Sequence, residues 1–440
     1  MKITMIGTGY VGLTSGVCYS EMGHTVICAD IDEDKIDQLK SNECPIYEPG
    51  LKELIIKNSS RGNLSFTTDI DEAVKLADIV MIAVGTPSLP DGGVDMFYVE
   101  EVARKIGKSI NNYKIIVNKS TVPVGSADKV RHIIQSCTNI PFDVASVPEF
   151  LREGSAVNDI LNGERIVIGV DSEKAKDILI NTHAPFNIPI QVTDIRSAEL
   201  IKYAANSFLA MKISFINEIA NLAEKVGADV LEVAKGIGSD SRIGNKFLNA
   251  GIGFGGACFP KDTLGLISIA EQVGHDFAIM KEVVKVNSKQ YLKVIEKLQS
   301  VYPKLNGKTV SILGLSFKPN TNDLREAPSI KIIEELVKIT NGNINIRVFD
   351  PISMEEARGQ LPNSIEYCYS VENAVTESDA AIIVTEWKDI VEENWVELAK
   401  CMNSPIIIDG RNSLNLIDND NITYLGIGRK ERALRLVNPL

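Results

Sequence analysis

The sequence has no long hydrophobic run and no cluster of basic residues. Because no stretch of about 18 consecutive apolar residues occurs, we expect no membrane-spanning helix. The 58 Asp and Glu outnumber the 46 Lys and Arg, and the resulting net charge of −12 argues against nucleic acid or an anionic membrane as a partner. A strand-like pattern begins at Lys2, which leaves no room for a cleavable signal peptide.

The chain also lacks paired cysteines. Its seven cysteines are scattered, and none forms a Cys-x-x-Cys pair. We therefore expect neither a metal site nor a disulfide framework, and a reduced cytoplasmic protein is the simplest account. Cys18, Cys28, Cys368 and Cys401 lie in apolar or helical surroundings, so we predict that these four thiols are buried and inert.

What the chain does contain is typical of a globular α/β protein. Its 440 residues suggest about three domains, and 44% of them are hydrophobic. In the first part, strand-like runs alternate with helical patterns such as Glu33–Lys40 and Val99–Ile110, which predicts a doubly wound parallel sheet. The predicted strands are Lys2–Gly7, Thr25–Asp30, Ile79–Val84, Ile115–Asn118, Phe142–Val147 and Ile166–Val170.

The middle of the chain is helical. Ser197–Val226 contains no Gly or Pro, and apolar residues cover more than one side of the helix that it predicts. A helix of this length, apolar on several sides, is easiest to place between two domains or two subunits. Further helical patterns follow at Asp262–Val273 and Met280–Ser300.

The α/β rhythm returns after the Asn306-Gly307 turn, so the two α/β parts could be distant copies. We expect two Rossmann-like domains joined by a central all-α domain, divided as residues 1–195, 196–300 and 301–440. The predicted strands of the last domain are Val310–Leu315, Ile346–Asp350, Ala380–Thr385 and Ile406–Asp409, with helical runs at Ser329–Thr340 and Trp395–Met402.

A glycine-rich turn follows the first strand. The sequence GTGYVG, residues 7–12, opens a helical pattern at Thr14–Gly23, and its glycines would let a pyrophosphate approach the helix N-terminus. Asp30 ends the next strand, where a carboxylate would accept hydrogen bonds from the ribose of NAD and repel the 2′-phosphate of NADP. Lys35 could neutralise the dinucleotide, although a solvated helix lysine is nearly as good an interpretation. The predicted contacts of this turn are Gly7, Gly9, Tyr10, Val11 and Gly12.

Two loops that follow later strands carry hydroxyl groups. Thr86 lies in Val84–Pro87 and Thr121 lies in Ser120–Gly125, at strand ends where ligands of open α/β sheets bind. Ordinary turn chemistry would explain either loop alone.

The strongest local signal is GIGFGGACFPKD, residues 251–262. Its glycines would allow close approach to a ligand, and Pro260 suits the start of the next helix. Cys258 would then precede a helix N-terminus with Lys261 nearby, and both effects favour a thiolate. Asp262 could act as a base or orient water. A structural cysteine in a glycine turn is the alternative, but it explains the glycines poorly.

A thiolate suits a dehydrogenase that removes two hydrides. An aldehyde must become tetrahedral before a second hydride can leave, and a cysteine adduct provides that thiohemiacetal. Its oxidation gives a thioester, which water converts to a carboxylic acid. One site could thus take an alcohol to an acid with two NAD.

Two pairs of polar residues complete the set. Lys202 and Asn206 share a face of the long helix and could stabilise an oxyanion, unless they are a snorkelling lysine and a surface amide. Glu149 and Glu153 follow another strand and could orient water or substrate hydroxyls, although exposed carboxylates on a first helical turn are common.

Together these segments resemble the nucleotide-sugar 6-dehydrogenases over nearly the whole chain. The shared motifs are GTGYVG, VGTP, STVPVG, PEFLREG, ELIKYAANSFLAMKISFINE, RIGNKFLNAGIGFGGACFPKD and GLSFKPNTNDLREAPS. This sequence has Val147 and Ala257 where the family more often has Asn and Ser, and neither position is catalytic.

The resemblance implies residue roles. Cys258 would be the nucleophile, and Lys202, Asn206 and Asp262 would stabilise oxyanions or activate water. Thr121, Glu149 and Glu153 would help to place the water; which residue activates it stays open among Asp262, Glu149 and Glu153. NAD contacts would come from Asp30, Lys35, Thr86, Thr121, Glu153, Lys261 and Arg325. UDP-sugar contacts would come from Glu149, Phe150, Leu151, Arg152, Glu153, Lys202, Asn206, Arg242, Phe247, Leu248, Asn249, Ala250, Gly251, Gly255 and Lys318, with Arg411 a weaker candidate.

The implied activity is the oxidation of UDP-glucose to UDP-glucuronate with two NAD and one water, in a homodimer formed through the long helix. GDP-mannose or a UDP-N-acetylhexosamine is an alternative substrate for the same chemistry. A two-electron hydroxyacid dehydrogenase and a non-enzymatic nucleotide sensor are the other readings. The sensor would be expected to lack Cys258, Lys261 or Asp262, and all three are present.

Overall fold

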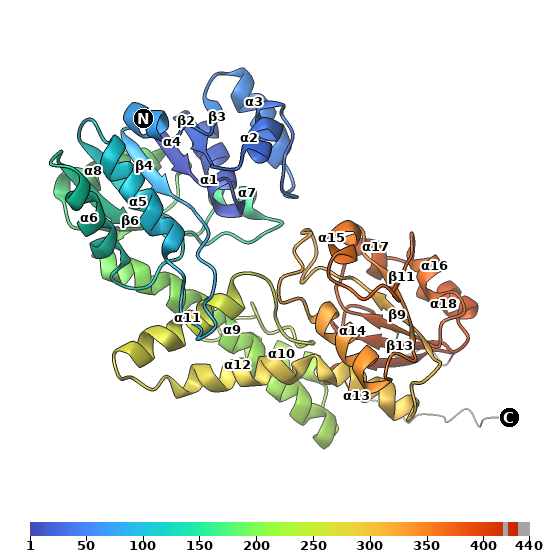
Figure 1. Cartoon of the computed structure of the whole chain (residues 1–440). Helices are drawn as coiled ribbons and strands as arrows, with labels where there is room; N and C mark the ends of the chain where they lie inside the picture. Colours follow the sequence, from blue (N-terminus) through green and yellow to red (C-terminus); the bar gives the residue numbers. More distant parts are fainter. Residues whose placement is uncertain (417–420, 430–440) are drawn as a thin grey trace. The chain divides into compact units, whose positions relative to one another are not determined.

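The computed structural model describes residues 1–416 and 421–429 (Figure 1). The described residues form two compact units, of which the first contains residues 1–205 and 264–276 and the second contains residues 206–263, 277–416 and 421–429. The division predicted at residues 195 and 300 stays a prediction, and its last domain extends beyond the described residues. Among the described residues, no helix is long and apolar enough to cross a membrane.

The first unit contains an eight-stranded sheet in the order β3-β2-β1-β4-β5-β6-β7-β8. The first six positions reproduce the order of a dinucleotide-binding Rossmann sheet. All pairs are parallel except β6 with β7, so the predicted parallel sheet contains one antiparallel step. The strands are β1 (Lys2–Ile6), β2 (Thr25–Ala29), β3 (Leu64–Thr67), β4 (Ile79–Ile82), β5 (Lys114–Asn118), β6 (Phe142–Ser146), β7 (Ile166–Val170) and β8 (Ile190–Thr193).

Helices cover both faces of this sheet. One buried cluster joins the strands to α1, α2, α3 and α8, and a second joins them to α4, α5 and α6. Their bounds are α1 (Tyr10–Glu21), α2 (Glu33–Lys40), α3 (Leu51–Ser60), α4 (Ile70–Leu76), α5 (Phe97–Ser109), α6 (Ser126–Cys137), α7 (Ala156–Leu161) and α8 (Glu173–His183). The predicted doubly wound architecture is confirmed.

The long helix predicted at Ser197–Val226 is α9, Ile195–Val226. Its 32 residues correspond to a length of roughly 48 Å. It is followed by α10 (Val230–Gly238), α11 (Phe259–Gln272), α12 (Ala278–Gln290) and α13 (Leu292–Val301). The helical pattern predicted over Met280–Ser300 is confirmed as two helices, α12 and α13, which are separated by Tyr291.

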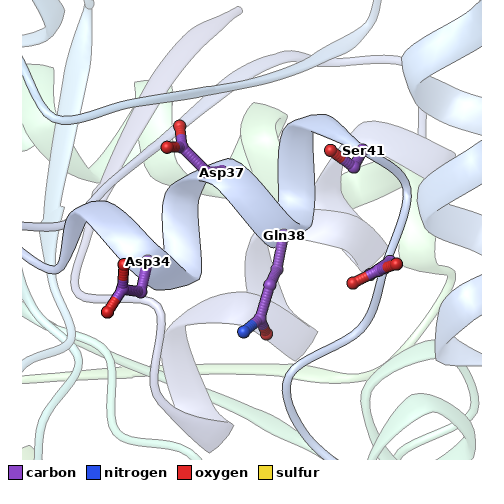
Figure 2. A pocket seen from close by; sticks show the side chains of 5 residues that line it. Asp34, Asp37, Gln38 and Ser41 are labelled. Carbon is purple, nitrogen blue, oxygen red and sulfur yellow. The ribbon is translucent and has the colours of Figure 1, made fainter.

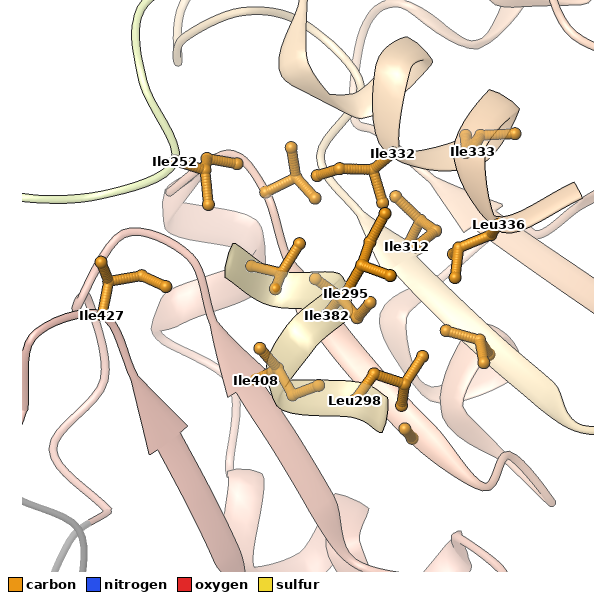
Figure 3. Close-up of a cluster of buried hydrophobic side chains, with 14 of the residues drawn as sticks. Ile252, Ile295, Leu298, Ile312, Ile332, Ile333, Leu336, Ile382, Ile408 and Ile427 are labelled. Carbon is orange, nitrogen blue, oxygen red and sulfur yellow. The ribbon is translucent and has the colours of Figure 1, made fainter. Parts of the chain in front are cut away.

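The second unit contains a six-stranded parallel sheet in the order β11-β10-β9-β12-β13-β14, the same order as the first six strands of the other sheet. Figure 3 shows the core in which Ile295 and Leu298 of α13 pack with Ile332 of α14 over strand residues Ile312 and Ile382. The elements are β9 (Thr309–Leu313), α14 (Pro328–Ile339), β10 (Asn345–Phe349), α15 (Met354–Arg358), β11 (Glu366–Tyr367), α16 (Val371–Val375), β12 (Ala380–Ile383), α17 (Lys388–Val391), α18 (Trp395–Leu398), β13 (Ile406–Asp409) and β14 (Thr423–Gly426).

Both sheets use the same glycine turn after their central strand. Gly7 has φ +103° and donates its N–H to Ala29, while Gly314 has φ +87° and donates to Phe349. A carboxylate follows each second strand, and in the second unit this is Asp350. Asp350 is buried and accepts from the backbone of residues 315, 316, 352 and 353, from the Ser316 hydroxyl and from the Trp387 indole.

The cysteine predictions are confirmed at three of four positions. Cys18, Cys28 and Cys368 are buried, and burial raises the pKa of the first two thiols to about 12 and of Cys368 to about 11. Cys401 is exposed, so its predicted burial is wrong. It ends a short 3-10 turn over Ala399–Cys401, where the apolar neighbours pack inward and the thiol does not.

Candidate functional site

The carboxyl ends of β1, β4, β5 and β6 bring the predicted loops of the first unit to one edge of its sheet. Ser120 donates its hydroxyl to the Val84 carbonyl over 2.7 Å, and Thr86 donates to the Thr121 carbonyl over 2.9 Å. The two hydroxyl-bearing loops therefore bind each other directly, as neighbouring strands require. Because the Thr86 hydroxyl donates its proton to this hydrogen bond, its oxygen can act only as an acceptor for a ligand.

The glycine turn fits a dinucleotide. A Cβ at Gly7 would lie 2.5 Å from the Ala83 carbonyl oxygen, so only glycine fits there, whereas a Cβ at Gly9 would meet open space. No side chain caps α1, although Asp32 and Asp69 cap α2 and α4. The first N–H groups of α1 are thus left for an anion such as a pyrophosphate.

Asp30 retains room for one more donor. Its carboxylate accepts from the Thr8 N–H at 2.6 Å, the Thr8 hydroxyl at 2.8 Å and the Asp32 N–H at 3.1 Å. A carboxylate has about four acceptor positions, so one remains for a ribose hydroxyl. Lys35 pairs with Asp32 at 3.2 Å and is partly exposed, which matches the solvated-lysine alternative as well as a cofactor contact.

Lys202 and Glu149 form a buried ion pair. Lys202 Nζ lies 2.9 Å from Glu149 Oε1, and the two side chains are 3% and 6% exposed. The snorkelling alternative for Lys202 is therefore wrong. The helical-turn alternative for the glutamates is also wrong, because residues 147–152 are irregular and α7 begins only at Ala156. Glu149 also accepts the Leu151 N–H at 2.7 Å, which fixes the loop around it, and Glu153 is buried as well.

The rest of this loop is held by cations. The Phe150 ring has the Arg165 guanidinium 4.1 Å and Lys202 Nζ 5.6 Å from its centroid. Arg152 binds Asp159 through two nitrogens, at 2.9 and 2.7 Å. The predicted substrate role of Arg152 stays a prediction, and in this structure its guanidinium fixes the loop.

Two charged residues at this edge were missed by the sequence analysis. Lys119 is buried directly after β5, and burial lowers its pKa to about 8, with Glu149 raising that pKa and Lys202 lowering it. Glu199 of α9 accepts the N–H groups of Gly125 at 2.6 Å and Ala127 at 2.9 Å, so it caps α6 and holds the loop that carries Thr121. Burial raises the pKa of Glu199 to about 7. One feature of the sequence indicated a role for Lys119, which is its position directly after the apolar strand β5.

In the second unit, Cys258 lies directly before α11. Its carbonyl accepts the Asp262 N–H over 2.8 Å, which makes Cys258 the N-cap residue, and Pro260 occupies the first turn. The predicted position before a helix N-terminus is confirmed. Because the first turn of a helix favours negative charge, this position favours the thiolate.

The glycines before Cys258 let the loop pack closely against its protein surroundings, and their predicted approach to a ligand stays a prediction. A Cβ at Gly253 would lie 2.7 Å from Asn287 Oδ1, and one at Gly256 would lie 2.7 Å from the Phe317 ring. At Gly251 it would meet the Gly410 carbonyl oxygen at 2.7 Å. Protein atoms therefore already fill these close approaches, and the glycines let the loop pack tightly.

Four polar side chains fix this loop. Asn217 accepts the Gly251 N–H at 2.8 Å, and Gln290 donates to the Gly251 carbonyl at 2.9 Å. Asn287 bonds both backbone groups of Phe254. Arg411 donates to the Gly253 carbonyl at 3.0 Å and to the Val384 carbonyl at 2.8 Å. In this structure the Arg411 guanidinium binds the loop before Cys258. The weaker prediction that Arg411 contacts a ligand stays a prediction.

Asp262 is the centre of a buried polar group. It is 1% exposed, and its two oxygens lie 2.6 Å from Asn206 Nδ2 and 2.5 Å from Lys261 Nζ. The sequence predicted a role for each of these residues, and the structure shows that they contact one another. Asn206, Lys261, Asp262 and Cys258 belong to the second unit, and Lys202, Glu149 and Glu153 belong to the first.

The remaining predicted contacts lie in loops of the second unit. Arg242 is highly exposed and pairs with Asp240, and Arg325 pairs with Asp323. Lys318 Nζ lies 5.6 Å from the centroid of the Phe317 ring. Within the stretch from Phe247 to Gly251, Leu248 and Ala250 are buried and Asn249 is exposed. Their ligand roles stay predictions.

A hollow on the surface of α2 is lined by polar and negatively charged side chains, which do not suit an anionic nucleotide (Figure 2). Its lining residues are Asp34, Asp37, Gln38, Ser41 and Glu43. Three carboxylates and no cation would repel a nucleotide. Among the described residues, no group of His, Cys, Asp or Glu is arranged to hold a metal ion.

Comparison with known proteins gives the same picture for all parts of the chain. Models of the NAD-binding, central and UDP-binding domains of one family match residues 1–187, 196–289 and 311–416. The UDP-glucose 6-dehydrogenase TuaD of Bacillus subtilis is 49% identical over 97% of this chain and 93% of its own length. The UDP-glucose 6-dehydrogenase of Rhizobium meliloti is 43% identical over 98% of this chain and 100% of its own.

A solved structure agrees over the same length. The UDP-glucose dehydrogenase of the hyperthermophilic archaeon Pyrobaculum islandicum has a TM-score of 0.91 and 37% identity, and the match covers 97% of both chains. Two Rossmann-like sheets, a helical middle and full-length similarity thus point to one conclusion. The chain belongs to the UDP-glucose/GDP-mannose dehydrogenase family, whose members are NAD-dependent oxidoreductases.

Proposed function

We propose that the protein oxidises UDP-glucose to UDP-glucuronate, using two NAD and one water for each sugar. The observation that carries this proposal is the position of Cys258 at the N-cap of α11, four residues before an Asp262 bound by Asn206 and Lys261. A two-electron alcohol dehydrogenase needs no such thiol. Names of relatives that are 41–49% identical support UDP-glucose as the sugar.

Each residue has a part in this reaction. When bound, NAD accepts the hydride in both oxidations. The Cys258 thiolate attacks the aldehyde carbon, and the resulting thiohemiacetal oxyanion is stabilised by cationic and amide donors, for which Lys202 and Asn206 are the candidates. After the second oxidation the thioester is hydrolysed. Water needs a base for that step, and Asp262, Glu149 and Glu153 are the candidates.

The electrostatics support these roles. Lys202 Nζ lies 2.9 Å from Glu149, and because a lysine ammonium has three N–H donors, it can bind this carboxylate and still donate to an oxyanion. Asn206 donates one amide N–H to Asp262 over 2.6 Å, and its second amide N–H can donate to a ligand. A GDP-mannose or UDP-N-acetylhexosamine substrate would use the same groups, so the choice of sugar rests on the relatives.

The proposed activity is tested by counting NADH. Purified protein with limiting UDP-glucose and excess NAD is expected to form two NADH and one UDP-glucuronate, measured by absorbance and chromatography. One NADH per sugar would favour the two-electron reading. Parallel assays with GDP-mannose and UDP-N-acetylmannosamine would reject UDP-glucose if either were the better substrate by kcat/KM.

We also propose a homodimer formed through α9. Phe208, Phe215 and Leu222 are 58%, 52% and 54% exposed, and they recur every seven residues along this helix. Seven-residue spacing places apolar side chains on one stripe, which is the seam of two packed helices. The sequence predicted a place for this helix between two domains or two subunits, and a second copy would cover the exposed stripe.

A charge on this stripe is expected to separate the subunits. Phe215→Glu should shift the mass in analytical ultracentrifugation from dimer to monomer, because a carboxylate at the seam loses its hydration. Tyr369→Glu is the matched control, since Tyr369 is 85% exposed and lies outside α9. A wild-type protein that sediments as a monomer would reject this interface.

The proposed compartment is the cytoplasm. All seven cysteines are free thiols, as expected where thiols are kept reduced.

A further inference from the structure

A buried glutamate outside the predicted site connects two segments of the first unit, the glycine turn before α1 and the loop that carries Glu149 and Glu153. Glu48 lies between α2 and α3 and is 7% exposed. Its Oε2 accepts the Gly154 N–H at 2.6 Å, and its Oε1 accepts the Ala156 N–H at 2.7 Å. It therefore holds the segment that directly follows Glu153, one of the proposed water- and substrate-binding residues.

The same carboxylate binds the dinucleotide turn. The Tyr10 hydroxyl is shared between Glu48 Oε2 and the Tyr47 carbonyl, which lies 2.9 Å away, and the Gly154 N–H also lies 3.0 Å from the Tyr10 oxygen. Tyr10 is the first residue of α1, directly after Gly9, whose surroundings are open. Burial and the Glu48 carboxylate both raise the pKa of Tyr10, so its hydroxyl keeps its proton and acts as the donor.

Glu48 thus connects the glycine turn to the segment that follows Glu153 through direct hydrogen bonds. Tyr10 directly follows Gly9, and its hydroxyl contacts Glu48. Glu48 in turn fixes the backbone at residues 154 and 156. The hydrogen bonds of Glu48 with Tyr10, Gly154 and Ala156 are direct, and the Glu48 side chain is buried. The two loops consequently share one charged acceptor.

We infer that Glu48 is a positioning residue that couples dinucleotide binding at the glycine turn to sugar-nucleotide binding at the loop carrying Glu149 and Glu153. This inference rests on the proposed function for the identity of the two ligands. It requires that each ligand changes the affinity of the other by the same factor, because a coupling free energy between two sites is reciprocal.

Binding without turnover tests the coupling. NADH and UDP-glucose form no products together, so calorimetry can give the Kd of each ligand alone and with the other at saturation. For the wild type we expect a change of about 5-fold or more, in the same ratio for both ligands. In Tyr10→Phe that ratio should fall towards 1, since the link from the turn is lost while the Glu48 bonds to Gly154 and Ala156 remain.

Further variants separate coupling from folding. Glu48→Gln should lose the coupling too, and combining it with Tyr10→Phe should cause no further loss, because both act on one path. Glu43→Gln, an exposed acid in the same segment, should retain the wild-type ratio. Should Glu48→Gln not fold, Tyr10→Phe alone decides. A wild-type ratio of 1, or an unchanged ratio in Tyr10→Phe, would overturn the inference; failure of UDP-glucose to bind at all would also overturn the proposed function.

Discussion

Cys258→Ser is expected to reduce UDP-glucuronate formation by at least ~10³-fold. A serine at the N-cap of α11 keeps the helix start but is a far weaker nucleophile, so no thiohemiacetal can form. NADH formation should then not exceed one per sugar, measured by absorbance under limiting UDP-glucose. The size of this loss follows from the covalent step, which no other side chain in the proposal can supply.

Cys401→Ser is the control for this experiment, because Cys401 is a free and exposed thiol of the same unit. It should leave both NADH formation and acid formation at wild-type rates. If Cys258→Ser still makes UDP-glucuronate at an undiminished rate, the thiolate mechanism is rejected, whatever the identity of the sugar.

Lys202→Met is expected to have two separable effects. It removes an oxyanion donor, which should lower kcat by about 10²–10³-fold. It also removes the direct ion-pair partner of the buried Glu149, so that Lys119 is the remaining buried cation acting on this carboxylate, and we expect a loss of up to about 3–5 kcal/mol in the free energy of unfolding. The first effect is measured by steady-state kinetics, and the second by urea unfolding.

A double variant distinguishes the two effects. In Lys202→Met with Glu149→Gln both charges of the ion pair are gone, while the glutamine carbonyl can still accept the Leu151 N–H that Glu149 accepts now at 2.7 Å. We expect most of the stability to return and the activity to stay low. Lys225→Met, at an exposed position of the same helix, should change neither property. Recovery of activity together with stability would show that the Lys202–Glu149 pair is only structural.

Strands buried on both faces were predictable from sequence, because they read as continuous apolar runs. Four short strands that mix apolar with polar residues were missed. They are β3 (Leu64–Thr67), β8 (Ile190–Thr193), β11 (Glu366–Tyr367) and β14 (Thr423–Gly426). The antiparallel pairing of β6 with β7 was missed for a different reason. The alternation of strands and helices indicates parallel neighbours in general, but it does not show where one pair of strands reverses direction.

The site was predictable where its residues are adjacent in the chain. Cys258, Lys261 and Asp262 lie in one motif, and their clustering is confirmed. The supports were not predictable, because Asn287 and Glu48 contact loops that are 33 and 106 residues away. Their function is a hydrogen bond to a distant backbone group, which leaves no local signature.

The repeated turn of the second sheet has a consequence for stoichiometry. Asp350, the counterpart of Asp30, already receives six donors, two of which come from Ser316 and one from the Trp387 indole. A carboxylate with about four lone-pair positions has none to offer an adenosine sugar. Although each chain contains two similar nucleotide folds, titration with NADH should therefore saturate at one molecule per chain.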